Sequence, residues 1–129
     1  MHIVTDTHPW VWFLTANPRL SSKAKGALAD PSNLIIVPSI VLMEIRYLYQ
    51  HRRIPLSFEA AMEQVESCSN ILIVPLDISV VTVSPIALDI HDAIIVGTAL
   101  QAAEDFGQTA ALVTIDRAIT DSGLVPIIW

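Results

Sequence analysis

Cysteine, glycine and positive charge are all scarce in this chain of 129 residues. Its single cysteine, Cys68, cannot form an internal disulfide and belongs to no zinc-binding spacing, which excludes a disulfide-stapled or zinc-ribbon protein. The four glycines are scattered, so no glycine-rich phosphate loop is present. The N-terminus lacks the features of a secretory signal, and no apolar run approaches the length of a membrane span. We therefore expect a cytoplasmic protein without membrane association.

The composition indicates an ordered, acidic protein. Hydrophobic residues make up 53% of the chain and charged residues 16%, which excludes a disordered chain, and the length fits one domain spanning 1–129. Thirteen acids against seven Lys and Arg give a net charge of −6, which argues against nonspecific binding to polyanions. Arg46, Arg52 and Arg53 nevertheless lie close together. They form either a local basic patch or a solvated helix end whose positive charges interact favourably with the helix dipole.

Short apolar strands alternate with helical segments along the chain. We predict strands at 3–5, 34–37, 71–74, 111–114 and 126–129. We predict helices at 9–14 with Thr7 as N-cap, and at 21–29, 39–50, 57–68, 92–106 and from 116 onward. The segment 77–87, which Pro85 interrupts, has no clear pattern. This alternation is typical of an α/β fold with a largely parallel sheet.

Most of the acidic residues have a structural explanation. Glu59, Glu63 and Glu66 recur at helical spacing and form one solvated face. Capping and solvation explain the acids at predicted turns and helix ends, namely Asp30, Asp77, Glu104, Asp105 and Asp121.

Four other carboxylates are harder to explain. Asp6 and Asp116 each follow a predicted strand, where either could cap the next helix and stabilise it by about 1 kcal/mol. Glu44 falls on the apolar face of its helix, where an unpaired charge is costly. Asp92 opens the most apolar predicted helix, although Asp89, three residues earlier, could cap the same helix.

A shared cation site explains all four carboxylates together. In open parallel sheets, ligands gather at the carboxyl ends of the strands, where Asp6 and Asp116 lie. Converging carboxylates would repel one another and raise their own pKa values unless a divalent cation neutralised them. Ligands that are all oxygen select Mg²⁺ or Mn²⁺, and such a site suits phosphodiester hydrolysis.

Four motifs in order carry a resemblance to a known family: IVTDTH at 3–8, PSIVLMEI at 38–45, HDAIIVGTAL at 91–100 and LVTIDRAI at 112–119. Together they resemble a PIN domain, in particular the VapC-type toxins of bacterial and archaeal toxin–antitoxin pairs. The resemblance spans essentially the whole chain. It implies a three-layer α/β/α sandwich around a central, mostly parallel sheet.

The resemblance also assigns roles to residues. Thr114 matches a hydroxyl residue that supports the family's site, and Asp89 matches an additional acid of many members. Ala93 stands where VapC relatives often have Arg, and Pro38 where they commonly have a small residue. The catalytic and metal-binding positions match the family's acidic quartet, which binds Mg²⁺ or Mn²⁺ for ribonuclease activity: Asp6, Glu44, Asp92 and Asp116.

The implied partners are RNA, a small antitoxin protein and a second copy of the chain in a homodimer. Arg46, Arg52 and Arg53 are candidates for contacts with RNA phosphates. Trp10 and Trp12 could stack on bases, but we expect helix packing or a dimer surface instead.

Two alternatives stay open at this point. A noncatalytic PIN-like module would keep the quartet as a metal site without turnover. A receiver-type signalling domain also gathers acids at the carboxyl ends of a parallel sheet, but it needs an acidic pair after its first strand.

Overall fold

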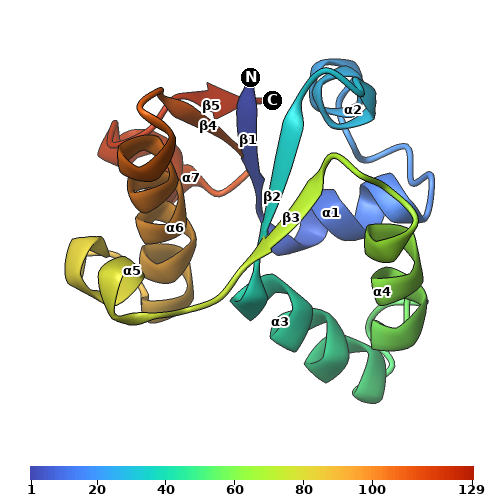
Figure 1. Ribbon diagram of the computed structural model, residues 1–129. Helices are drawn as coiled ribbons and strands as arrows, with labels where there is room; N and C mark the ends of the chain where they lie inside the picture. Colours follow the sequence, from blue (N-terminus) through green and yellow to red (C-terminus); the bar gives the residue numbers. More distant parts are fainter.

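The computed structural model describes residues 1–129, and its five strands form one sheet in which every neighbouring pair is parallel (Figure 1). The order across the sheet is β3-β2-β1-β4-β5, which confirms the predicted α/β class. Receiver-type domains have the order 2-1-3-4-5, so that alternative is wrong. The strands are β1 (His2–Thr5), β2 (Leu34–Pro38), β3 (Ile71–Val74), β4 (Ala110–Val113) and β5 (Ile127–Ile128).

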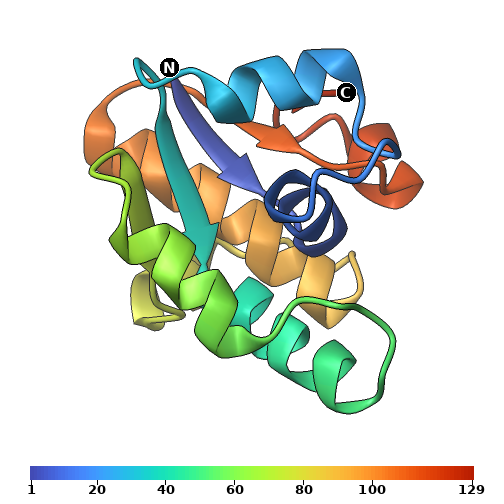
Figure 2. The ribbon, with the colours of Figure 1, turned by 90° about the vertical axis from the view of Figure 1, so that its right-hand side faces the viewer.

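Helices cover both faces of the sheet and complete the predicted three layers (Figures 1 and 2). α6 packs on β1 and β4 with α5 outside it, while α1, α2 and α4 lie on the other side. α3 starts where β2 ends and extends beyond the carboxyl edge of the sheet. None of the helices is both long and apolar enough to cross a membrane. The helices are α1 (Thr7–Leu14), α2 (Ser22–Ala29), α3 (Ser39–Gln50), α4 (Phe58–Glu66), α5 (Ile78–Val83), α6 (Ile90–Phe106) and α7 (Arg117–Ser122).

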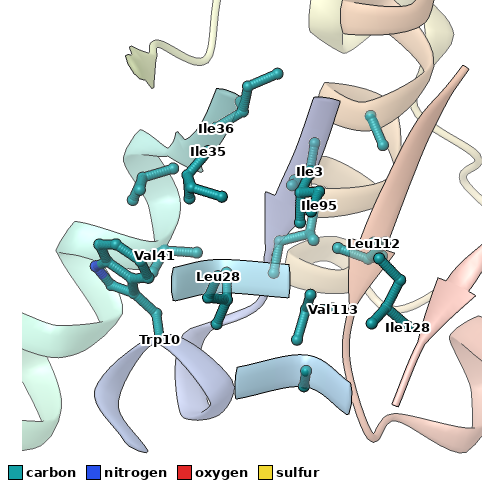
Figure 3. Packing of buried hydrophobic residues seen from close by; sticks show 14 of the residues in the cluster. Ile3, Trp10, Leu28, Ile35, Ile36, Val41, Ile95, Leu112, Val113 and Ile128 are labelled. Atoms are coloured by element: carbon teal, nitrogen blue, oxygen red, sulfur yellow. The ribbon is translucent and has the colours of Figure 1, made fainter. Parts of the chain in front are cut away.

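One hydrophobic core of 28 buried residues fills the space between the sheet and its helices (Figure 3). Ile3 and Val4 of β1 are fully buried because the central strand is covered on both faces, and each such side chain contributes about 1.5–3 kcal/mol. Trp10 and Trp12 are buried as well, which confirms that they pack inside the protein. Gly97 allows α5 to approach α6, because a Cβ at this position would collide with Ser84.

Around three acidic residues the structure differs from the sequence expectations. The N-cap of α1 is Asp6 and not Thr7, because the Asp6 carboxylate accepts the Thr7 N–H and the helix begins at Thr7, two residues before the predicted start at Pro9. α6 begins at Ile90, so Asp92 lies in its first turn rather than at its start. The segment 77–87 contains the short helix α5, which Asp77 caps.

Candidate active site

Asp6 is fixed at the carboxyl end of the central strand by hydrogen bonds to both of its oxygens. Oδ1 accepts the backbone N–H of Thr7 at 2.7 Å, and Oδ2 accepts the hydroxyl of Thr114 at 2.6 Å. Burial raises the pKa of Asp6 above its usual value, and the charge of Asp116 adds to this rise, although the two hydrogen bonds oppose it. The carboxylate is therefore held in position, but its hydrogen bonds do not offset the cost of burying its charge.

Thr114 connects the first and last members of the predicted quartet. Its buried hydroxyl donates to Asp6 and accepts the backbone N–H of Asp116 at 3.0 Å. Asp116 also caps α7, because its Oδ1 accepts the N–H of Ile119 at 2.9 Å. One threonine thus connects the carboxyl ends of β1 and β4, and its role in supporting a functional site stays a prediction.

Glu44 reaches the same edge of the sheet from α3 and carries the least satisfied oxygen of the site. Its side chain is 24% exposed, yet Oε1 is buried without a hydrogen bond, and the nearest cationic group is His91 Nδ1 at 4.0 Å. The Thr7 hydroxyl lies close by, also buried and without a hydrogen bond of ordinary geometry. Burial raises the pKa of Glu44, and the charges of Asp6 and Asp92 reinforce this rise against His91.

Asp92 completes the group from the first turn of α6. Burial raises its pKa first, followed by the charges of Asp116, Asp6 and Asp89. Asp89 is exposed at the N-cap of α6, where its side chain makes no capping hydrogen bond. The charge of Asp116 raises the pKa of Asp6 and Asp92, and the charges of Asp6 and Asp92 raise that of Glu44, so the structure brings the predicted quartet together.

The donor chemistry of this cluster fits a hard divalent cation. Four carboxylates supply oxygen ligands, burial and then like charges raise the pKa values of three of them, and the buried Glu44 Oε1 lacks a partner. The carboxylates are neighbours rather than a closed coordination sphere, because no three His, Cys, Asp or Glu side chains are placed to hold one ion between them. Asp6 and Asp116 each commit one oxygen to a helix cap, which restricts their freedom to converge.

None of the three predicted phosphate-binding arginines forms an ion pair with the quartet. Arg46 is on α3, and Arg52 and Arg53 follow its last turn, all exposed. Sequence reasoning missed two nearby features: the Thr7 hydroxyl beside Glu44, and a stack of Tyr47 on His51. The helical spacing of Glu44, Tyr47 and His51 is the one signal that could have indicated the second feature.

The fold and this edge define a parallel α/β protein with acids gathered at the carboxyl ends of its strands. The sequence model of the PIN domain matches residues 3–121, and the chain belongs to the PIN domain family. Among twelve matching chains of solved structures is one from the VapBC2 complex of Rickettsia felis, bound to a DNA fragment from its promoter. It is 18% identical, covers 98% of this chain and 97% of its own, and has a TM-score of 0.65. A search of curated proteins found no match.

Proposed function

We propose that the chain is a Mg²⁺- or Mn²⁺-dependent endoribonuclease that hydrolyses RNA in the cytoplasm, with residues 1–129 as a single PIN domain. The observation that carries this proposal is the convergence of Asp6, Glu44, Asp92 and Asp116 at one edge of the sheet, with a buried, unpartnered oxygen on Glu44. A divalent cation supplies the charge that this arrangement lacks. Membership of the PIN domain family supports the same chemistry.

The chain's own residues prepare the site for an in-line displacement at phosphorus. A bound Mg²⁺ or Mn²⁺ supplies Lewis acidity for the activation of a water and for charge neutralisation. Thr114 and the Thr7 N–H hold the two oxygens of Asp6, and the Ile119 N–H holds Asp116. No covalent nucleophile is required, and the proposed products carry a 5′-phosphate and a 3′-hydroxyl.

A pair of aspartates on one short helix tests the proposal. Asp116→Asn keeps an oxygen for the Ile119 N–H but removes the charge, whereas Asp121→Asn removes an exposed charge at the other end of α7. We expect Mn²⁺ binding by calorimetry and Mn²⁺-dependent RNA cleavage to be lost only in Asp116→Asn. Full activity of Asp116→Asn contradicts the proposal. Binding of Mn²⁺ without turnover in the parent chain would establish the noncatalytic PIN-like alternative.

The proposed biological role is that of a VapC-type toxin whose partner is a small antitoxin. The similar fold in the VapBC2 complex and the sequence motifs support this role. Induced expression of the parent chain in a bacterium should arrest growth, and Asp6→Asn should not. Growth without arrest would remove the toxin role and leave the proposed nuclease activity to the cleavage assay.

We also propose a homodimer through the apolar surface beside α5. Leu76, Val81, Ile86 and Ile90 line a groove of about 440 Å³, and Ile86 and Ile90 are 93% and 74% exposed. These four side chains carry no charge, so the surface can pair with itself about a two-fold axis. Ile86→Glu should convert a dimer to a monomer in light scattering; an unchanged mass contradicts this surface as the dimer contact.

A further inference from the structure

The exposed face of α3 connects the acidic site with a basic region at the helix end. Glu44, Tyr47 and His51 follow one another at intervals of three and four residues, so they lie along one side. A groove of about 390 Å³ contains Glu44, Tyr47 and His91. A second groove of about 670 Å³ begins at the C-terminal end of the helix and includes Arg52 and Arg53. The surface from Glu44 through Tyr47 and His51 to these arginines is called the α3 track here.

Positive charge lies beside the α3 track at Arg46 and at its far end at Arg52 and Arg53, and no protein group neutralises it. No Asp or Glu occurs between Glu44 and Glu59, although the chain has a net charge of −6. Arg46, Arg52 and Arg53 are exposed and form neither an ion pair nor a side-chain hydrogen bond, unlike Arg117, which pairs with an acid on its own helix. Uncommitted arginines on a polar groove are suited to phosphate groups.

The middle of the α3 track is a rigid aromatic surface. The rings of Tyr47 and His51 stack with centroids 4.0 Å apart and planes inclined by 26°. The Nδ1 atom of His51 lies 2.8 Å from the Tyr47 carbonyl oxygen, a hydrogen bond that fixes the imidazole. Tyr47 is 53% exposed, so the pair is accessible from solvent. An exposed and preorganised pair of rings can stack on a nucleic-acid base.

Arg52 occupies a backbone conformation in which glycine is usual. Its φ is +56°, and it follows the C-cap residue of α3. The Arg53 N–H donates to the Leu48 carbonyl at 2.9 Å and the Arg52 N–H to the Tyr49 carbonyl at 3.0 Å, which is the Schellman pattern of helix termination. A side chain at this position strains the backbone, and strained residues cluster at functional sites. The arginine side chain therefore needs an explanation other than stability.

We propose that the α3 track binds a single strand of RNA and leads it to the carboxylates. In this arrangement a base stacks on the Tyr47–His51 pair, and Arg46, Arg52 and Arg53 contact phosphates. A single strand is required because paired bases in a duplex do not offer their faces for stacking. That the RNA leads to the carboxylates rests on the proposed ribonuclease function, but RNA binding to the α3 track can be measured without cleavage.

The first test measures affinity for a labelled single-stranded RNA by fluorescence anisotropy without divalent metal. We expect Tyr47→Ala to weaken binding about five-fold or more because it removes the ring on which the base stacks, and Tyr47→Phe to bind like the parent. A blunt-ended RNA duplex of matching sequence, which has no unpaired bases, should bind more weakly to the parent. Equal affinity of the parent, Tyr47→Ala and Tyr47→Phe would overturn the stacking step.

The second test measures how affinity falls with salt. Arg52→Ala with Arg53→Ala should reduce the slope of log affinity against log salt by about 0.7 for each phosphate that the variant no longer neutralises. Lys23→Ala with Lys25→Ala removes the same charge from α2, at the opposite end of the sheet, and should leave the slope unchanged. Arg52→Gly should melt at or above the temperature of the parent while its salt slope falls. An unchanged slope in the arginine variants would overturn the phosphate contacts.

Cleavage kinetics separate this inference from the proposed function. If the chain cleaves RNA, Tyr47→Ala should raise KM and leave kcat nearly unchanged, whereas Asp116→Asn removes turnover. A parent chain that binds RNA along the α3 track but never cleaves it would contradict the nuclease proposal alone. Cleavage with unaltered KM in the track variants would contradict the track alone. In a further contrary outcome, polyglutamate binds the parent as tightly as RNA does, with an affinity that Tyr47→Ala does not change. That result would assign the groove to an acidic polypeptide and overturn the proposal.

Discussion

Asp6 and Asp77 are both N-cap residues, and they have opposite electrostatic surroundings. Asp77 is exposed, and its pKa lies below the usual value because Ser79 donates its hydroxyl at 2.6 Å and the Val80 N–H donates at 3.1 Å. Asp6 also receives a hydroxyl and a backbone N–H, but burial raises its pKa in spite of them. The same capping role therefore gives two kinds of carboxylate. Asp77, whose pKa is lowered, is called the relaxed kind, and Asp6, whose pKa is raised, the strained kind.

The difference lies in what surrounds each cap. Asp77 is exposed at the N-terminus of α5, the helix that lies outside α6 (Figure 1), so water solvates its charge. Asp6 lies at the carboxyl edge of the sheet, where Glu44, Asp92 and Asp116 add negative charge. A capping acid is thus a candidate metal ligand when its hydrogen bonds do not offset the rise in pKa that burial and neighbouring negative charges cause.

The largest expected effect is that of Asp6→Asn, with Asp77→Asn as the matched variant of the other cap. Asparagine keeps the capping oxygen at either position, so both variants should fold. We expect Asp6→Asn to lower Mn²⁺ affinity and RNA cleavage by more than the roughly 10- to 100-fold typical of losing a supporting residue. Asp77→Asn should match the parent in calorimetry and in the cleavage assay. Equal losses in the two variants would contradict the distinction between the caps.

The next effect concerns Thr114, which supports Asp6 from the neighbouring strand. Thr114→Val leaves Asp6 Oδ2 and the Asp116 N–H without their partner, so we expect about 10- to 100-fold weaker Mn²⁺ binding or activity. Unfolding by denaturant should show a loss of about 1–3 kcal/mol. Thr114→Ser should restore both properties.

A buried threonine elsewhere provides the control for Thr114. The Thr98 hydroxyl donates to the Ile94 carbonyl inside α6, away from the carboxylates. Thr98→Val should change stability but not Mn²⁺ affinity. If Thr114→Val behaves like Thr98→Val, then Thr114 only stabilises the fold.

The sequence predicted the sheet better than the details of its edge. Strands such as 71–74 and helices such as 39–50 matched the structure because their apolar patterns follow the buried faces directly. The strand 126–129 shortened to Ile127–Ile128, and α5 was missed, because β5 is a short edge strand and α5 has only six residues. Short elements depend on tertiary contacts that periodicity does not record.

For the site, the sequence indicated which acids converge but not how their side chains are held. Strand ends predict the place of Asp6 and Asp116, and the early turns of their helices that of Glu44 and Asp92, and the structure brings all four together. Their catalytic roles stay predictions. The orphaned Thr7 hydroxyl beside Glu44 could not be foreseen, because it depends on how α1 packs against α3.

Glu44→Gln should produce a smaller effect of opposite sign, on stability. The substitution keeps the side-chain shape and removes a half-buried charge that has no partner at Oε1. We expect the metal-free chain to gain up to about 1 kcal/mol in unfolding free energy at neutral pH, because such a charge is costly to bury. Thermal unfolding in a metal chelator measures this gain, with the exposed Glu63→Gln as an unchanged control. A loss of stability in Glu44→Gln would show that the carboxylate is already satisfied.

The smallest expected effect is the dependence of metal-free stability on pH, in which the two classes of acid act in opposite directions. The folded pKa values of Asp6, Glu44 and Asp92 are raised, so their contribution is fully present below the unfolded values of 3.8 for Asp and 4.5 for Glu. It is lost as pH rises through the higher folded values. The pKa of Asp77 is lowered, so its contribution is present above 3.8 and is lost as pH falls through the folded value.

Thermal unfolding of the parent, Glu44→Gln and Asp77→Asn across the acidic range separates these two contributions. Glu44→Gln should reduce the fall in stability as pH rises, and Asp77→Asn should reduce the fall as pH decreases. The change in Asp77→Asn should be the smaller one, because water screens an exposed carboxylate. If both variants changed stability on the same side of the pH curve, the contrast between the relaxed and the strained carboxylates would be wrong. The proposal of a cation at Glu44 would then lose its electrostatic basis.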